Sequence, residues 1–389
     1  MKVLTAPDSF KGALSSAAAA AVMAAAVREV FPGAVVKEIP LSDGGEGFTA
    51  ALVRAAGGTT EEVTVHDPLM RPVQAVMGLL DHGRTAVIEM AAASGLERLR
   101  REEYNPWVTS TYGTGEMIRA ALDRRCRRIL VGVGGSATVD GGVGAIQALG
   151  GRFLDRYGHE LPPGGGQLSR LARIDLSSLD RRLRGVMTEV ACDVTNPLTG
   201  PAGAAAVYAP QKGADSGMTR RLEEGLALLA RRLREATGVD TATMPRAGAA
   251  GGLAAGLAAC LGARLRPGFE VVNEITGLEK ALSGMNLVLT GEGHTDRQTL
   301  YGKAPYALAQ LAASHDVPVL LFTGGLEKEA AEELGRAFTA IFPVNPALIS
   351  LEEALERTEE HLRFAVVQAM RLLQRGTARK TRSKKGSTT

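Results

Sequence analysis

Residues 1–47, MKVLTAPDSFKGALSSAAAAAVMAAAVREVFPGAVVKEIPLSDGGEG, predict a strand, a helix and a second strand in succession. The apolar run Val3–Ala6 predicts the first strand, and Ser15 or Ser16 can cap the alanine-rich helix that follows it. Val35–Leu41 predicts the second strand, which ends in an Asp-Gly-Gly turn before another helix. This alternation favours an α/β domain with a parallel sheet.

The C-terminal part of the chain repeats the same alternation. Predicted strands cover Leu287–Thr290, Val317–Phe322 and Thr339–Val344, and helices separate them. A long helix over Leu351–Arg375 is expected to close this part. Because about two hundred residues separate the first two strands from these three, the sequence predicts one doubly wound domain that is interrupted by a second one.

The intervening residues have strands of their own. These are expected at Val63–Val65, Ala86–Met90, Ile129–Val133 and Val186–Ala191. We therefore expect a discontinuous α/β domain and an inserted α/β domain, with a cleft that closes over a small substrate. The predicted boundaries are 1–65 with 285–375 for the first domain, 66–284 for the inserted domain and 376–389 for a disordered basic tail.

Acidic loops follow three of the strands of the first domain. They begin at Asp8, Asp43 and Glu292, and the first of them also contains Lys11. The carboxyl ends of parallel strands form the ligand-binding edge of an open α/β sheet. Phosphoryl transfer needs carboxylates for magnesium, a group that orients the acceptor hydroxyl and positive charge on the phosphates. Each loop alone could be an ordinary turn, but three at one edge indicate a site.

Three segments of the inserted domain could bind an anion or orient a substrate. Gly134-Gly135-Ser136 follows a strand, and its backbone amides suit a phosphate group, although a tight turn or a dinucleotide site is also compatible with it. Asp193 follows the next strand, where an ordinary Asp/Asn turn is the alternative. Lys212 lies in a glycine-bounded turn and can meet an anion.

Other features exclude several classes of function. The chain contains no Walker loop, no protein-kinase motif and no G-x-S-x-G elbow, and its six histidines lack metal-ligand spacing. The apolar run Ala17–Val27 is shorter than the roughly 20 residues that a membrane span needs. Three distant cysteines and the absence of a secretory signal fit the cytoplasm. We therefore expect no membrane partner.

The chain carries a net charge of +3, but the positive charge is concentrated at the C-terminus. The last fifteen residues contain six basic side chains and no acidic one. A solubilising tail explains this run better than a nucleic-acid contact, because no aromatic side chains interleave with the charges. The expected partner is a small-molecule substrate, and the sequence is compatible with a homo-oligomer.

The ordered motifs resemble the bacterial glycerate kinase family of the first type, from Met1 to about Leu373. The segments that carry the resemblance are 6–12, 43–47, 67–69, 89–96, 111–116, 134–138, 191–197, 210–214 and 290–293. The resemblance implies ATP, Mg²⁺ and D-glycerate as acceptor, with 2-phosphoglycerate as product. It also implies a flavodoxin-like domain that carries an inserted α/β domain.

The resemblance and the loops together suggest roles for individual residues. We assign catalytic roles to Asp8, Lys11, Asp43 and Asp193, with Asp43 as the acceptor of the hydroxyl proton or as a magnesium ligand. The expected substrate-binding residues are Ser9, Ser94 and Lys212, and the expected metal ligands are Glu292 and Asp296. The expected nucleotide-binding residues are Gly44, Gly45, Gly134, Gly135, Ser136, Gly291 and Gly293.

Two alternatives to a glycerate kinase remain open from the sequence. One is a kinase for another small hydroxy acid or sugar acid. The other is a regulator that senses glycerate without converting it and contacts DNA through its tail. The acidic loops at Asp8, Asp43, Asp193 and Glu292 favour an enzyme, because a sensor would not need all of them.

Overall fold

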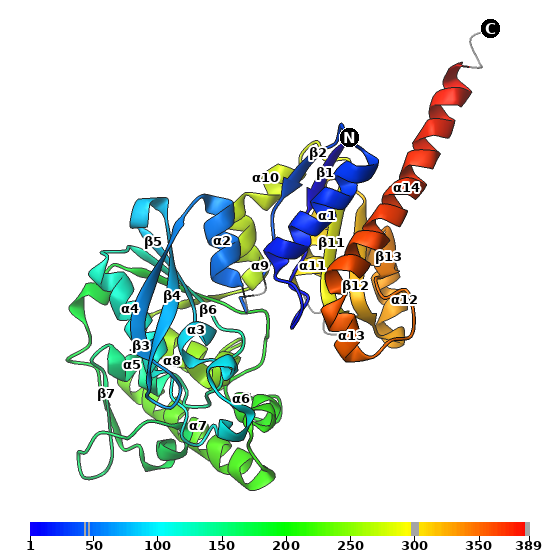
Figure 1. The fold of residues 1–389 in the computed structure, drawn as a ribbon. Helices are drawn as coiled ribbons and strands as arrows, with labels where there is room; N and C mark the ends of the chain where they lie inside the picture. The colour runs from blue at the N-terminus through cyan, green and yellow to red at the C-terminus, as the bar shows by residue number, and fades with distance from the viewer. Residues whose placement is uncertain (43, 46, 297–302, 386–389) are drawn as a thin grey trace. The chain divides into compact units, whose positions relative to one another are not determined.

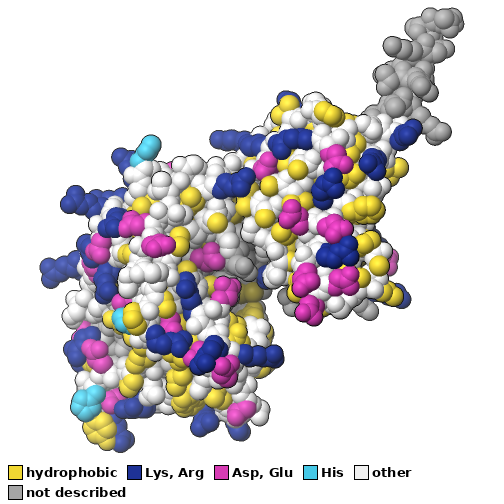
Figure 2. All heavy atoms as spheres, viewed as in Figure 1, with side chains coloured by type: hydrophobic (Ala, Val, Ile, Leu, Met, Phe, Trp, Pro, Cys, Tyr) yellow, Lys and Arg dark blue, Asp and Glu magenta, His cyan; other side chains and the backbone are white. Residues whose placement is uncertain are grey.

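The computed structural model describes residues 1–42, 44, 45, 47–296 and 303–385 (Figure 1). The chain divides into two compact units, Met1–Ser42 with Val272–Thr389 as unit 1 and Asp43–Val271 as unit 2. Basic and acidic side chains are interspersed over the visible face of each unit (Figure 2). No helix in the described ranges combines the length and apolarity that crossing a membrane requires.

Unit 1 contains a five-stranded parallel sheet. Its strands are β1 (Lys2–Thr5), β2 (Val35–Glu38), β11 (Leu287–Thr295), β12 (Val319–Leu326) and β13 (Ala340–Pro343). Their spatial order is β2-β1-β11-β12-β13, and every neighbouring pair is parallel. This is the 2-1-3-4-5 order of flavodoxin-like folds, so the predicted doubly wound domain is confirmed. β2 lies on one side of β1, and the later strands β11, β12 and β13 are added on the other side. The strand order therefore reverses between β1 and β11.

Helices cover this sheet. They are α1 (Ser16–Val30), α10 (Leu278–Leu282), α11 (Ala304–Ala313), α12 (Lys328–Ala337), α13 (Leu351–Glu356) and α14 (Thr358–Lys385). Ser15 caps α1 by accepting a hydrogen bond from the Ala18 amide, as predicted. Buried side chains of α1 and α14, such as Met23 and Val366, pack with Leu289 and Phe322 of the sheet in one apolar core.

The C-terminal helix differs from the predicted one. The expected helix over 351–375 is divided at Arg357 into α13 and α14, and α14 continues to Lys385. The backbone is therefore helical through most of the segment that was expected to be a disordered tail, and Figure 1 shows this helix extending beyond the body of unit 1. Residues 386–389 lie outside the described residues.

Unit 2 contains a six-stranded mixed sheet in the order β10-β9-β6-β5-β4-β3. Its strands are β3 (Thr59–His66), β4 (Pro72–Leu80), β5 (Thr85–Glu89), β6 (Arg128–Gly132), β9 (Met187–Ala191) and β10 (Arg264–Arg266). β5, β6, β9 and β10 are parallel, whereas β3 and β4 add an antiparallel hairpin. A separate pair joins β7 (Arg152–Leu154) to β8 (Arg173–Asp175).

The helices of unit 2 contact the hairpin strands β3 and β4 and also β5 and β10. They are α2 (Phe48–Ala56), α3 (Ala91–Ser94), α4 (Tyr112–Asp123), α5 (Val143–Ala148), α6 (Ala204–Tyr208), α7 (Ser216–Thr237) and α8 (Leu253–Leu261). α9 (Gly268–Thr276) crosses the boundary between the units. The core is rich in alanine, leucine and valine and includes Met77, Ile88, Val131 and Leu226.

The boundaries of the two units differ from the predicted domain boundaries. Residues 43–65 belong to unit 2, because β3 pairs with β4 along its whole length and α2 packs against β4. Glu89 also holds the start of α2, since its carboxylate accepts hydrogen bonds from the Gly47 and Thr49 amides. At the other end, residues 272–284 belong to unit 1, where α10 packs against α11.

Candidate active site

The loop after β1 lies against the C-terminal part of β11 in unit 1, at the point where the strand order reverses. The structure extends this strand to Thr295, beyond the predicted end at Thr290, so Gly291, Glu292 and Gly293 lie in β11 and not in a loop. The Asp8 amide donates to the Gly291 carbonyl at 2.8 Å, and the Gly293 amide donates to the Ser9 carbonyl at 3.3 Å. A Cβ atom on Gly291 would lie 2.5 Å from the Phe322 carbonyl oxygen, so only glycine allows this approach. Asp8, Ser9, Gly291 and Gly293, which the sequence assigned to one site, are therefore neighbours. Ligands of doubly wound sheets bind at this edge.

Carboxylates from the loop after β1 and from the C-terminal part of β11 lie at this edge. Asp8 is half-buried and accepts a hydrogen bond from the Ser9 amide at 2.7 Å. Glu292 is buried, and its Oε1 lies 3.0 Å from the Thr295 hydroxyl. Asp296 lies just beyond β11 and forms an ion pair of 3.3 Å with Lys303. The edge thus offers acidic oxygens that are held in place by their neighbours.

Lys11 lies in the same loop, and its side chain is exposed. A Cβ atom on Gly293 would be 3.1 Å from the Lys11 amide nitrogen, so the backbone of this loop runs close over β11. Among the described residues, no group of three or more His, Cys, Asp or Glu side chains is arranged to hold a metal ion. A magnesium site here would depend on one or two carboxylates.

In unit 2, a glycine-rich contact joins the loop after Asp43 to the ends of β6 and β9. The Gly134 amide donates to the Gly44 carbonyl at 3.1 Å. A Cβ atom on Gly134 would lie 2.3 Å from Gly45 Cα, and one on Gly44 would lie 2.5 Å from the Ala191 carbonyl oxygen. These glycines therefore allow backbone segments to pack directly on one another. Asp43 itself lies outside the described residues.

Lys212 contacts the glycine-rich loop that contains Gly134, Gly135 and Ser136. Its ammonium is buried and donates to Ser136 Oγ at 2.6 Å and to the Thr138 carbonyl at 2.8 Å. Burial lowers the pKa of Lys212 to about 7, and the carboxylate of Asp140 opposes that shift. The sequence assigned Lys212 and Ser136 to the site separately, and the structure brings them into direct contact.

Asp140 is a buried acid in this region to which the sequence assigned no role. Its carboxylate accepts hydrogen bonds from the Thr111 amide and hydroxyl and from the Gly142 and Gly144 amides. Burial raises the pKa of Asp140, and these donors oppose the shift. Asp140 thus fixes the loop after Ser136 to the start of α4. The only local signal in the sequence is an aspartate that precedes two glycines.

Ser94 supports the glycine-rich loop from its other side. Its side chain is fully buried, and its hydroxyl lies 2.8 Å from that of Thr114. Its carbonyl accepts from the Ala137 amide, and the next turn is held by a hydrogen bond from the Leu96 amide to the Gly135 carbonyl. The structure therefore places Ser94 in the packing around the loop, whereas the sequence assigned it to substrate binding.

Asp193 follows β9, next to the strand that carries the glycine-rich loop. Its Oδ1 accepts a hydrogen bond of 2.6 Å from the amide of Gly268, the first residue of α9. Nearby, Asn196 accepts a hydrogen bond from the Tyr208 hydroxyl and donates to the Ala202 carbonyl. Asp193 thus ties the segment after β9 to the start of α9, 75 residues away in sequence, whereas Asn196 makes contacts within its own part of the chain.

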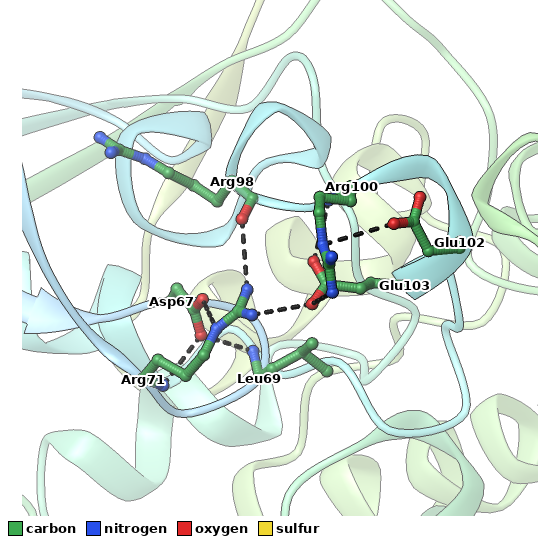
Figure 3. A network of polar contacts seen from close by, with 7 residues as sticks. All are labelled: Asp67, Leu69, Arg71, Arg98, Arg100, Glu102 and Glu103. Atoms are coloured by element: carbon green, nitrogen blue, oxygen red, sulfur yellow. Dashed lines mark hydrogen bonds and ion pairs between the residues drawn. The ribbon is translucent and has the colours of Figure 1, made fainter.

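A network around Asp67 holds the segment that reaches the glycine-rich loop (Figure 3). Asp67 is buried, accepts hydrogen bonds from the amides of Leu69 and Arg71, and forms an ion pair with the Arg71 side chain at 2.5 Å. Arg71 also pairs with Glu103 at 2.9 Å. The Arg100 amide and the Arg71 side chain lower the pKa of Glu103 to about 2. The network thereby ties residues 96–103 to the β3–β4 hairpin.

The comparisons with known proteins point in one direction. The model of the glycerate kinase family matches residues 3–374. Glycerate kinase of Bacillus subtilis (strain 168) is 47% identical over 362 residues, which cover 93% of this chain and 95% of that protein. Glycerate 2-kinase of Escherichia coli (strain K12) is 41% identical over 362 residues, again 93% and 95%.

A solved structure agrees with these matches. The crystal structure described as glycerate kinase 2 from Salmonella typhimurium LT2 superposes with a TM-score of 0.86 at 42% identity. It covers 97% of this chain and 99% of its own. The family match and the structural match both include the two units and the loops described above. The chain therefore belongs to the glycerate kinase family and is an enzyme of the kinase class.

Proposed function

We propose that this enzyme transfers the terminal phosphoryl group of ATP to the 2-hydroxyl of D-glycerate, which gives 2-phospho-D-glycerate and ADP. The observation that carries the proposal is the match to a protein named glycerate 2-kinase over 95% of that protein's length. That name supports the 2-hydroxyl as acceptor. The chemistry of the loops is consistent with phosphoryl transfer, in which positioning and electrostatic stabilisation matter most.

The glycine-rich loop of unit 2 is the proposed anion-binding element. Gly135 and Ser136 can offer backbone amides to phosphate oxygens, while the Gly134 amide, which donates to the Gly44 carbonyl, holds the loop in place. Lys212 holds Ser136 and the Thr138 carbonyl, so its charge lies directly behind the loop. Arrival of an anionic phosphate favours the protonated form of Lys212, because an opposite charge stabilises an ammonium. In this proposal Lys212 positions the loop and balances the charge of the bound anion.

The carboxylates of unit 1 are the proposed site for the metal. Mg²⁺ is usually bound by one or two carboxylates, with substrate phosphates and water completing an octahedron. Glu292 and Asp296 fit that requirement in the chemistry of their oxygens, with Asp8 on the adjoining loop. When bound, Mg²⁺ would neutralise negative charge on the phosphates. Lys11 is exposed in the same loop and supplies a mobile positive charge for an anionic ligand.

For the acceptor hydroxyl we propose a carboxylate that takes up its proton. Asp43 is the first candidate, since it follows β2 and precedes two glycines, and Asp8 and Asp193 are the alternatives. The hydrogen bond between Asp193 and the first amide of α9 favours a supporting role for that acid. Ser9 belongs to the same loop as Asp8 and can bind a substrate oxygen.

The proposal is tested by measuring ADP formation with D-glycerate, ATP and Mg²⁺. The product can be identified by adding enolase, which dehydrates 2-phosphoglycerate directly but needs a mutase to use 3-phosphoglycerate. We expect an enolase signal without mutase. A signal only after mutase is added would move the acceptor to the 3-hydroxyl. No ADP from folded protein with D-glycerate would refute the proposal, and a panel of other hydroxy acids would then identify the acceptor.

A further inference from the structure

Two threonines connect the Glu292 carboxylate to the neighbouring strand of unit 1. Thr295 Oγ1 lies 3.0 Å from Glu292 Oε1 and 2.8 Å from Thr323 Oγ1. Thr323 Oγ1 in turn lies 2.6 Å from the Gly325 carbonyl oxygen. Glu292 and Thr323 are partners in the parallel register of β11 and β12. Thr295 and Thr323, here called the threonine relay, therefore join the carboxylate to a backbone acceptor on β12.

The threonine relay is enclosed by protein. Both threonines are fully buried, and Glu292 is 5% exposed. Burying a hydroxyl is unfavourable unless it is hydrogen-bonded, and apolar side chains of the same shape can fill the same space. Two adjacent buried hydroxyls in contact with a carboxylate therefore indicate a role that concerns the carboxylate as well as packing. The sequence assigned no role to either threonine.

The threonine relay has fewer protons than contacts. Each hydroxyl has one proton, whereas the Gly325 carbonyl and an ionised Glu292 can only accept. The three contacts therefore cannot all hold a proton while Glu292 is ionised. In one arrangement both hydroxyls donate toward Glu292, and in the other both donate toward the Gly325 carbonyl. The relay can thus give a hydrogen bond to the carboxylate or withdraw it by rotating two hydroxyl protons.

We propose that Thr295 and Thr323 are positioning residues that hold the Glu292 carboxylate in the orientation that binds the metal ion. This inference rests on the proposed role of Glu292 as a ligand of Mg²⁺. A hydrogen bond from Thr295 to Oε1 restricts rotation of the carboxylate and so orders both of its oxygens before a cation arrives. Once a cation has neutralised the carboxylate, the Thr295 hydroxyl can turn to Thr323. Partners of this kind are common around metal ligands, and losing one typically weakens metal binding about 10- to 100-fold.

The test measures binding of Mn²⁺, which takes the same oxygen ligands as Mg²⁺ and is detected by EPR. Mn²⁺ is titrated into the full-length protein with and without the non-hydrolysable nucleotide AMP-PNP. Thr295→Val removes the hydroxyl and nearly keeps the shape, and it should raise the Kd for Mn²⁺ about tenfold, or about 1.4 kcal/mol. Thr323→Val should raise this Kd by a smaller factor, whereas Thr295→Ser keeps the hydroxyl and should keep the wild-type Kd. Saturating Mg²⁺ should restore kcat in Thr295→Val, since the variant loses metal affinity and not a reacting group.

Thr290→Val is the matched control for the loss of a buried hydroxyl. Thr290 lies on the same strand and is fully buried, and its hydroxyl donates to the Ala6 carbonyl at 2.7 Å. Its replacement should lower the melting temperature about as much as Thr295→Val does and leave the Kd for Mn²⁺ unchanged. An unchanged Kd in Thr295→Val, or an equal rise in Thr290→Val, would overturn the proposal.

Glu292→Gln separates this inference from the proposed function. If Glu292→Gln weakens Mn²⁺ binding and Thr295→Val does not, Glu292 binds the metal and the inference about the relay is wrong. Absence of ADP formation by the wild-type protein would refute the proposed kinase activity, and Mn²⁺ binding would still test the relay. Wild-type protein that binds no Mn²⁺ in either condition, or Mn²⁺ binding that Glu292→Gln leaves unchanged, would overturn the inference as well.

Discussion

Replacing Lys212 with Met tests the electrostatics of the glycine-rich loop most directly. Methionine has a similar length and no charge, so the change removes the buried ammonium and its two hydrogen bonds to Ser136 and Thr138. Burial lowers the pKa of Lys212 from 10.5 to about 7 in the folded protein. Between these two values the unfolded chain holds a proton that the folded chain lacks. The free energy of unfolding therefore rises with pH through this window because of Lys212.

The size of the expected change in the free energy of unfolding follows from this pKa shift. Each pKa unit corresponds to about 1.36 kcal/mol, so the wild-type protein should gain a few kcal/mol relative to Lys212→Met between about pH 7 and pH 10. Asp140 is present in both proteins, so its own titration largely cancels in the comparison. Trp107 is the sole tryptophan and lies in unit 2, and its fluorescence can therefore follow denaturant unfolding of that unit. A stability difference that stays constant over this pH range would refute the lowered pKa of Lys212.

The same variant tests the proposed role in catalysis. A hydrogen bond from a charged group is worth about 1.5–3 kcal/mol, which predicts a loss of roughly 10- to 150-fold in kcat/KM. Gln211→Met changes the exposed neighbour in the same turn and should leave kcat/KM within about twofold, as surface changes usually do. If Lys212→Met retained wild-type kcat/KM, Lys212 would have no part in the site.

Four further substitutions or deletions test other parts of the proposal. Asp43→Asn should lower kcat by about 10²- to 10⁴-fold at an unchanged melting temperature if Asp43 accepts the hydroxyl proton; wild-type kcat would direct attention to the other acids. Glu292→Gln should raise the Mg²⁺ concentration needed for half-maximal activity, and an unchanged requirement would place the metal elsewhere. Asp67→Ala should lower the free energy of unfolding by about 2–4 kcal/mol, because it leaves Arg71 and two amides without their acceptor. Its control, Glu102→Ala at an exposed position, should change the free energy of unfolding by less than about 0.5 kcal/mol. Deleting Arg375–Thr389 should leave kcat/KM nearly unchanged, and a tenfold loss, about 1.4 kcal/mol, would make this segment part of the site.

The strand–helix alternation allowed the fold of unit 1 to be predicted from the sequence. Its five strands are short and mostly apolar, so each prediction needed only local information. The β3–β4 hairpin was predicted only in part, because β4 (Pro72–Leu80) has no regular alternation of apolar and polar residues. The boundaries of the units depend on which strand β3 pairs with, and that partner is not encoded within β3 itself.

The candidate site was predictable to the extent that it is local. Asp8 and Gly134 follow strands and Glu292 lies near the C-terminal end of β11, and the order of such sheets brings these strand ends to one edge within each unit. The state of Lys212 was not predictable, because its partner Ser136 lies 76 residues away in sequence. A lysine in a glycine-bounded turn is usually exposed, and only tertiary packing determines that this one is buried. The same holds for Asp140, because two of its four hydrogen bonds come from Thr111, 29 residues away in sequence.

The residues that we propose for phosphoryl transfer come from both units of this chain. Asp8 and Glu292 belong to unit 1, and the glycine-rich loop and Lys212 belong to unit 2. Phosphoryl transfer requires carboxylates for the metal and positive charge or amides for the phosphates. Residues 39–42 separate β2 from the start of unit 2, so the inserted unit follows the carboxyl end of β2, which belongs to the edge where doubly wound sheets bind ligands. A family match that covered either unit alone would lack one half of this requirement, and the observed match spans residues 3–374.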